Sequence, residues 1–167
     1  YHKDYLRGRN YDPDFLEEKY KLLGTGPGET FNKKSYDLRI CIPIINKRGK
    51  VISFQARDIT DKAKIRYKAC PIEDSVQDMK QTLYNLNNCN SNTIGIVEGV
   101  FDVWRMGDNF AATFGTGLTD GQIKALVQYE KIYWLFDPEP EAQKKAKGGA
   151  DKLASMGKHI ELIELDS

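Results

Sequence analysis

The chain has 167 residues, of which 40% are hydrophobic, and a formal net charge of +1. These values predict a globular chain and exclude a membrane span, because no run reaches the roughly 18–20 apolar residues that a span needs. Three cysteines without Cys-x-x-Cys spacing and two histidines argue against a zinc site or a disulfide framework. We therefore expect reduced thiols and a cytoplasmic location.

The N-terminal region predicts one short helix followed by turns. Asp12 or Asp14 is placed to begin a helix that runs to about Leu22 and ends at Gly24. The glycine-rich run 24–28 lacks the Gly-Lys-Ser/Thr ending of a phosphate-binding loop, so the pattern favours a plain turn.

The next elements are a β-hairpin and a second helix. Residues 38–45 and 51–57 are apolar or alternating, and the turn sequence Asn46-Lys47-Arg48-Gly49 separates them, which predicts two paired strands. Farther on, apolar residues three and four positions apart predict a helix over residues 76–86.

Charge is distributed unevenly along this sequence. Residues 1–97 hold 17 basic and 12 acidic residues, whereas residues 98–167 hold 8 and 12. The excess is greatest over residues 33–68, with 11 basic and 3 acidic residues, a density that favours a polyanion partner over a merely solvated face. Three aromatic residues in the same segment are expected to stack on bases: Tyr36, Phe54 and Tyr67.

From residue 92 onward, strand and helix signals alternate. Such alternation predicts an α/β domain with a compact, mainly parallel sheet flanked by helices. Trp104 and Trp134 are expected in its core, His159 at a strand edge, and the turn Gly115-Thr116-Gly117 offers free N–H groups to a phosphate. The strands are expected at 93–97, 109–113, 131–136 and 159–165, and the helices after Val100, from Thr119 to Tyr129 and from Glu141 to Met156.

Carboxylates follow two of these strands. Glu98 ends the strand 93–97, Asp102 lies in the first helical turn beyond it, and Asp137 ends the strand 131–136 two residues before Glu139. Because the carboxyl ends of parallel strands meet at one edge of a sheet, these side chains are expected to form a hard oxygen site that suits Mg²⁺. The alternative for Asp102 is that it only stabilises the helix N-terminus.

These motifs resemble two parts of one known enzyme family. Residues 94–102, Ile-Gly-Ile-Val-Glu-Gly-Val-Phe-Asp, resemble the strand-Glu-Gly-x-x-Asp motif of the Toprim domain, and residues 136–139 resemble its second motif. Toprim is shared by primases, topoisomerases and nucleases, so the upstream half narrows the choice. The stretches that resemble the basic subdomain of bacterial-type DNA primases are 39–44, 54–57, 66–71 and 80–86.

The resemblance implies a fold and a function. It implies a smaller basic α+β subdomain at residues 1–90 and a Toprim domain at 91–167, truncated at its C-terminus relative to a full core. The implied activity is template-directed synthesis of short RNA primers by metal-dependent nucleotidyl transfer, with Mg²⁺, for which Mn²⁺ can substitute, and without zinc in this segment. The implied partners are single-stranded DNA, ribonucleoside triphosphates and, through regions outside this chain, a replicative helicase; no membrane is implied.

The resemblance also carries over individual residues. Glu139 departs from the primase motif, which normally has Asp there, and Ala69 stands where the family has Asn; this divergence fits a phage or mobile-element source. A nuclease that uses the same acids to activate water, or a noncatalytic nucleic-acid-binding module, remains an alternative. The implied nucleic-acid or nucleotide contacts are Arg39, Arg57, Arg66, Lys68 and Lys80, and the implied catalytic acids are Glu98, Asp102, Asp137 and Glu139, of which Glu98, Asp137 and Glu139 are the metal ligands.

Overall fold

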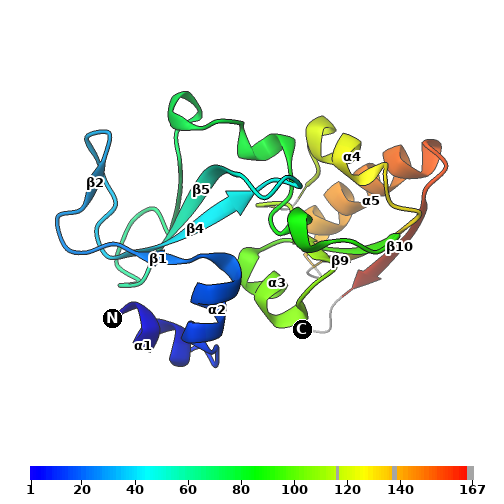
Figure 1. The fold of residues 1–167 in the computed structure, drawn as a ribbon. Coiled ribbons are helices and arrows are strands. Elements are labelled where there is room, and N and C mark those ends of the chain that lie inside the picture. Colours follow the sequence, from blue (N-terminus) through cyan, green and yellow to red (C-terminus); the bar gives the residue numbers. More distant parts are fainter. Residues whose placement is uncertain (116, 137–138, 165–167) are drawn as a thin grey trace. The chain divides into compact units, whose positions relative to one another are not determined.

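The computed structural model describes residues 1–115, 117–136 and 139–164, and the chain divides into two compact units (Figure 1). Unit 1 comprises residues 1–44 and 51–77, and unit 2 comprises residues 45–50 and 78–167. Residues 78–90 thus lie in the same unit as the C-terminal α/β region. Within the described ranges, the helices are all too short or too polar to cross a membrane.

Unit 1 begins with two short helices, α1 (His2–Arg7) and α2 (Pro13–Tyr20). The helix predicted to begin at Asp12 or Asp14 is confirmed as α2, and Asp12 caps it because its carboxylate accepts from two backbone N–H groups of the first turn. Helix α2 ends before Gly24, since Lys21 already adopts a left-handed conformation with φ of 57°. Helix α1 was not predicted, because six residues are too few to show an apolar period.

The sheet of unit 1 contains the predicted hairpin. Its strand order is β1-β4-β5-β6. The turn between β4 and β5, whose residues 45–50 are grouped with unit 2, is stabilised by Asn46, whose Oδ1 accepts from the N–H groups of Arg48 and Lys50. A separate small ladder pairs β2 (Thr30–Phe31) with β3 (Lys34–Ser35). The strands of the main sheet are β1 (Leu23–Gly24), β4 (Arg39–Ile45), β5 (Val51–Asp58) and β6 (Tyr67–Ala69).

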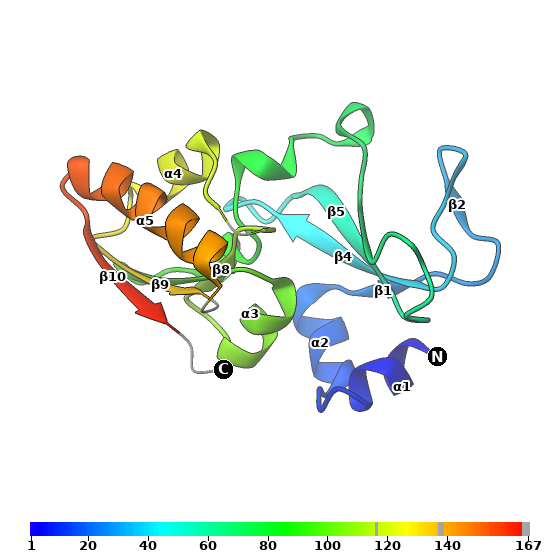
Figure 2. The same cartoon turned by 180° about the vertical axis from the view of Figure 1, so that it is seen from behind.

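Unit 2 is built on the predicted parallel sheet. The strand order is β10-β9-β7-β8, and each of its three strand pairs is parallel. Helices α4 and α5 cover one face and α3 lies on the other, as both views show (Figures 1 and 2). The elements are β7 (Thr93–Val97), α3 (Val100–Met106), β8 (Phe110–Ala112), α4 (Asp120–Leu126), β9 (Lys131–Phe136), α5 (Pro140–Ser155) and β10 (His159–Glu164).

The core of unit 2 lies between this sheet and helices α4 and α5. Trp134 is confirmed as a core residue, and Trp104 is also buried, with its indole Nε1 donating to the hydroxyl of Tyr84 over 2.9 Å. His159 lies on the edge strand β10, where it pairs with Glu161. The side chains that fill the core include Ile94, Ile96, Ile123, Leu126, Ile132, Ala146 and Leu153.

The helix predicted over residues 76–86 is wrong. The segment contains only the single turns η2 (Met79–Gln81) and η3 (Leu86–Asn88), and Asn85 between them has φ of 65°. Tyr84 instead exchanges two backbone hydrogen bonds with Ala112 of β8. The apolar spacing was real, since Leu83 and Leu86 are buried, but pairing with the sheet edge determined the backbone conformation.

Two adjacent glycines of α5 give a test of this packing. A Cβ at Gly148 would meet nothing within 4 Å, whereas a Cβ at Gly149 would lie 2.6 Å from the ring of Trp134. We expect Gly148→Ala to raise the free energy of unfolding by about 0.5–1 kcal/mol, because alanine favours the helix. Gly149→Ala should lower it by about 1–3 kcal/mol through overpacking.

Urea denaturation of the two variants measures both effects, and each variant is the control for the other. Equal effects of the two substitutions would contradict the packing of α5 on Trp134.

Candidate functional site

Two of the three aromatic residues of the basic segment, Tyr36 and Phe54, form a cluster with Phe31 within unit 1. The ring of Tyr36 is 2% exposed and packs edge-on against Phe54, with ring centroids 5.4 Å apart. Its expected stacking on bases is therefore wrong. The ammonium of Lys68 lies over the same ring, 4.6 Å from its centroid, and donates to the backbone carbonyl of Ser35.

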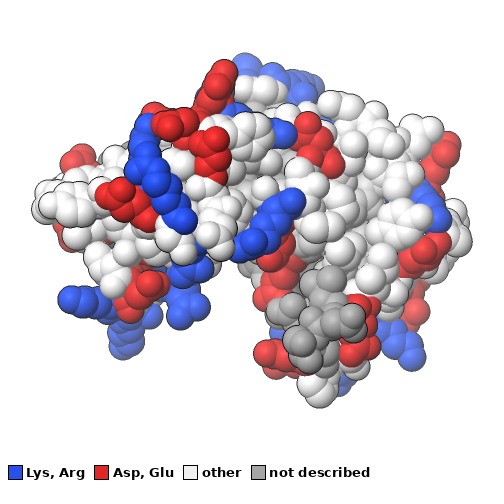
Figure 3. Space-filling model, turned by 90° about the horizontal axis from the view of Figure 1, so that it is seen from below, with Lys and Arg blue, Asp and Glu red and all other residues white. Residues whose placement is uncertain are grey.

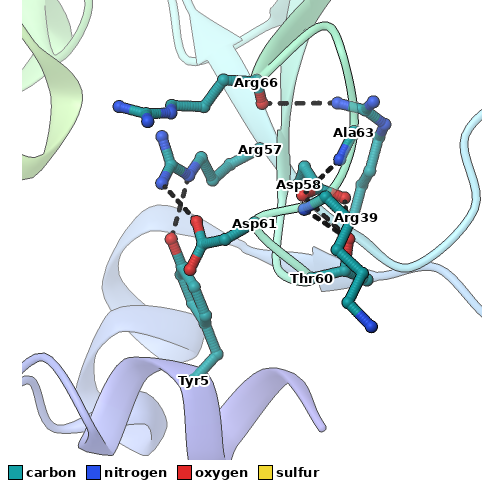
Figure 4. Close-up of polar contacts among 9 residues, drawn as sticks. Tyr5, Arg39, Arg57, Asp58, Thr60, Asp61, Ala63 and Arg66 are labelled. Atoms are coloured by element: carbon teal, nitrogen blue, oxygen red, sulfur yellow. Dashed lines mark hydrogen bonds and ion pairs between the residues drawn. The ribbon is translucent and has the colours of Figure 1, made fainter.

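Arg39 is a buried residue of β4. Its Nη1 donates to the carbonyl of Ala56 at 3.1 Å, and its Nη2 donates to the carbonyl of Ile65 at 2.9 Å. Nη1 also reaches the carbonyl of Arg66 at 3.4 Å (Figure 4). A guanidinium placed in this way satisfies carbonyl groups of the chain itself. The geometry favours a role for Arg39 in holding the loop that follows β5.

Asp58 holds the same loop from its other end. Its carboxylate is 3% exposed; both oxygens accept from the hydroxyl of Thr60 at 3.0 Å, and one lies 3.4 Å from the N–H of Ala63. The backbone N–H of Asp58 donates to the carbonyl of Arg66. Arg39 and Asp58 together close the loop 58–66, so it is a fixed structure that carries several basic side chains.

Arg57 and Arg66 present their guanidinium groups on one side of this loop, away from that of Arg39 (Figure 4). Arg57 is nearly buried: its Nε donates to the hydroxyl of Tyr5 at 2.9 Å, and it pairs with Asp61 at 3.3 Å. Its guanidinium also stacks over Tyr67, whose pKa burial raises to about 12. Arg66 is exposed, which makes its side chain accessible to a phosphate.

The basic excess of the sequence does not form a continuous stripe in the view of Figure 3. On this face, Lys and Arg side chains are interspersed with Asp and Glu. Several of the exposed cations have carboxylate partners in unit 1, such as Lys34 with Glu73 and Lys3 with Asp14. Such exposed pairs contribute little to stability. What this surface binds therefore depends on the local arrangement of its charged side chains.

In unit 2, two of the predicted acids share a pocket. Glu98 and Asp102 line a cavity of about 260 Å³ at the carboxyl ends of β7 and β9, together with Arg105 of α3. The sequence reasoning missed Arg105, although its spacing of three residues from Asp102 on a helix places both on one face. The remaining lining is apolar and consists of Val97, Met106, Leu135 and Phe136.

Asp102 also caps helix α3, because its Oδ2 accepts from the N–H of Gly99 at 3.0 Å. This is the alternative that the sequence left open for this residue. Glu139 is exposed at the N-cap position of α5, and Asp137 lies outside the described residues. Among the residues that are described, no three His, Cys, Asp or Glu side chains gather closely enough to hold a metal ion.

Lys80 belongs to unit 2, not to the basic loop. Its Nζ donates to the carbonyl of Phe114 over 3.2 Å, at the turn that follows β8. A Cβ at Gly115 would lie 4.0 Å from the same Nζ, so the ammonium stands directly over this glycine. The lysine and the glycine-rich turn were predicted separately, and the structure brings them together.

Comparison with known proteins identifies the family. The model of the DNA primase catalytic core, N-terminal domain, matches residues 2–90, more than half of the chain. The chain belongs to the DNA primase catalytic-core family. It is 33% identical over 146 residues to the DNA primase of Clostridium acetobutylicum and 30% identical over 156 residues to that of Aquifex aeolicus. These alignments cover 80% and 87% of the chain but only 24% and 30% of the two relatives.

Solved primase structures share the fold. The zinc-binding and RNA polymerase domains of Aquifex aeolicus primase match 99% of the chain and 49% of that structure, with a TM-score of 0.83 and 24% identity. A DnaG primase catalytic domain bound to single-stranded DNA matches 98% of the chain and 63% of that structure, with a TM-score of 0.82 and 21% identity. The fold similarity thus extends beyond the residues that the family model matches.

The contacts of Arg39 and Arg66 predict different effects on stability. Arg39→Met removes the donors for three backbone carbonyls, so we expect the free energy of unfolding to fall by about 1–3 kcal/mol. Arg66→Met should change it little, because the backbone carbonyl of Arg66 remains. Urea denaturation measures both, and equal losses would show that Arg39 does not hold the loop.

Proposed function

We propose that this chain is part of a primase catalytic core that joins ribonucleotides on a single-stranded DNA template. Its membership of the primase family carries the proposal. Support comes from one feature of each unit: an acidic sheet edge at Glu98 and Asp102 in unit 2, and a preformed basic loop that carries Arg66 in unit 1. One surface suits the phosphates of a nucleic acid and the other suits a reacting phosphoryl group.

We assign unit 2 to the Toprim class of domains, with Glu98, Asp137 and Glu139 as the residues that would hold Mg²⁺ or Mn²⁺. A set of carboxylate oxygens fits a hard divalent cation, and Glu98 lies at the carboxyl end of a central parallel strand, where ligands of open α/β sheets bind. A bound cation would neutralise charge on the transferring phosphoryl group and favour loss of the proton from the ribose 3′-hydroxyl.

The protein's own residues would orient the reactants. Lys80 supplies a positive charge at the turn after β8, where it would hold the phosphates of a nucleoside triphosphate. Arg66, with Arg57 beside it, would hold the template backbone, while Lys68 supplies charge at the aromatic cluster. Orientation of this kind converts an encounter between two substrates into a reaction within one complex.

The partners in this proposal are single-stranded DNA and ribonucleoside triphosphates, with a replicative helicase bound through parts of the protein outside this chain. The chain spans a quarter to a third of the curated relatives that it matches first.

Replacing Glu98 tests the chemistry. Glu98→Gln keeps the size of the side chain but removes its charge, so we expect incorporation of labelled ribonucleotides on single-stranded DNA to fall by at least about 100-fold. The assay compares the two proteins with Mg²⁺ and with Mn²⁺, and circular dichroism checks that the variant is folded. Full synthesis by Glu98→Gln would refute the assignment, and cleavage of DNA without incorporation would favour a nuclease.

Replacing Arg66 tests the template surface. Arg66→Met removes one phosphate contact, so we expect it to weaken binding of single-stranded DNA. The slope of log K against log salt concentration should become less steep by about 0.7. Fluorescence anisotropy with a labelled oligonucleotide at several salt concentrations measures the slope. Lys21→Ala, an exposed lysine at the end of α2, is the control and should leave the slope unchanged.

A further inference from the structure

Gln122 is a fully buried amide in helix α4 that joins three segments of unit 2. Its Nε2 donates to the carbonyl of Thr82 at 3.0 Å and to that of Thr113 at 2.9 Å. Its Oε1 accepts from the N–H of Thr119 at 3.0 Å. Both amide protons and the amide oxygen are therefore bonded to backbone groups, an arrangement that a side chain of another shape cannot reproduce.

Each of these segments adjoins Lys80. Thr82 follows it by two residues on the segment that begins at η2, and Thr113 directly precedes Phe114, whose carbonyl receives the Lys80 ammonium. The hydroxyl of Thr119 donates to the backbone carbonyl of Lys80 itself. The lysine is consequently held at its backbone and at its charged end by groups that Gln122 connects.

The packing of α4 against the Lys80 segment is also close. A Cβ at Gly121, the neighbour of Gln122, would lie 2.8 Å from the Cα of Gln81. The side chain of Gln81 lies against the same position, so helix and segment meet where only a glycine fits. The amide of Gln122 is bonded within this contact, where water cannot replace its hydrogen bonds.

The turn under the ammonium needs such support. Phe114 has φ of 63° and Gly115 has φ of 151°, so a residue with a side chain occupies the left-handed region at the start of the turn. Such a conformation persists when the surrounding contacts fix it. The bond from Gln122 to the carbonyl of Thr113 fixes the backbone just before it.

We infer that Gln122 is a positioning residue that sets the Lys80 ammonium over the turn after β8 and so prepares it for the phosphate groups of a nucleoside triphosphate. This inference rests on the proposed function. Gln122 does not touch the ligand; it acts through Lys80. A charge that is already in place binds an anion more tightly than one that must first be ordered, because less conformational freedom is lost on binding.

The experiment measures binding of two probes to this chain: ATP with Mg²⁺, and inorganic tripolyphosphate alone. Gln122→Met keeps the length of the side chain but removes its hydrogen bonds. We expect it to raise the Kd for both probes about ten-fold. Gln128→Met is the matched control, because Gln128 is exposed and its Nε2 donates to the carbonyl of Ala125 in the same helical region; it should leave both Kd values unchanged.

A double-mutant cycle with Lys80→Ala separates positioning from a general structural role. If Gln122 acts through Lys80, then Gln122→Met should have no further effect on Kd in the Lys80→Ala background. Additive losses, or no loss from Gln122→Met in the presence of Lys80, would overturn the inference. Where Gln122→Met does not fold, Thr119→Ala takes its place in the same cycle, since it removes the hydroxyl that holds the Lys80 carbonyl.

Failure of this inference is distinguishable from failure of the proposed function. Loss of binding in Lys80→Ala, with no effect of Gln122→Met, overturns only the role of Gln122. If Lys80→Ala leaves both Kd values unchanged, the inference falls, and the Glu98→Gln synthesis assay still decides the proposed function independently.

Discussion

Parallel pairing of β7 with both β8 and β9 is the constraint on which unit 2 depends. The register places Val97 beside Ala112 and Ile96 beside Trp134, so the carboxyl ends of the three strands lie at the same edge of the sheet. Glu98 follows the central strand at this edge, and the turn after β8 is joined to it by the bond from the Thr113 N–H to the Val97 carbonyl. The strand register therefore places Glu98 near the turn that begins at Thr113.

The register in turn depends on small residues at particular places. Gly95 lies in the middle of β7 opposite Phe110, and a Cβ there would come within 2.2 Å of the phenylalanine ring. The ring fills the space that the glycine leaves on the face of α3. A residue that weakens an isolated strand is therefore what allows β7 and β8 to pair closely in this sheet.

In unit 1, the main structural requirement is that a basic loop is held in one conformation. Positive charges that lie close together repel, and an open loop loses much conformational freedom when it is ordered. Burying Arg39 under the loop and anchoring Asp58 at its end replace the solvent contacts of the backbone with internal hydrogen bonds. The basic residues counted in the sequence therefore have two different roles in the structure. The guanidinium of Arg39 supports the loop from within, while that of Arg66 remains accessible.

The sequence by itself determined the elements whose signals are local or strongly periodic. The Asp12 cap, the hairpin at Asn46 and the alternation that produced β7 to β10 are encoded in neighbouring residues, and the family motifs are contiguous. Tertiary structure alone decided what residues 76–86 become, because pairing of Tyr84 with Ala112 outweighs an apolar period that also suits a helix. It also decided that Arg39 and Tyr36 are buried and that Gln122 bonds to Thr82. Contacts between segments that are distant in the sequence produce no regular residue spacing from which they could be predicted.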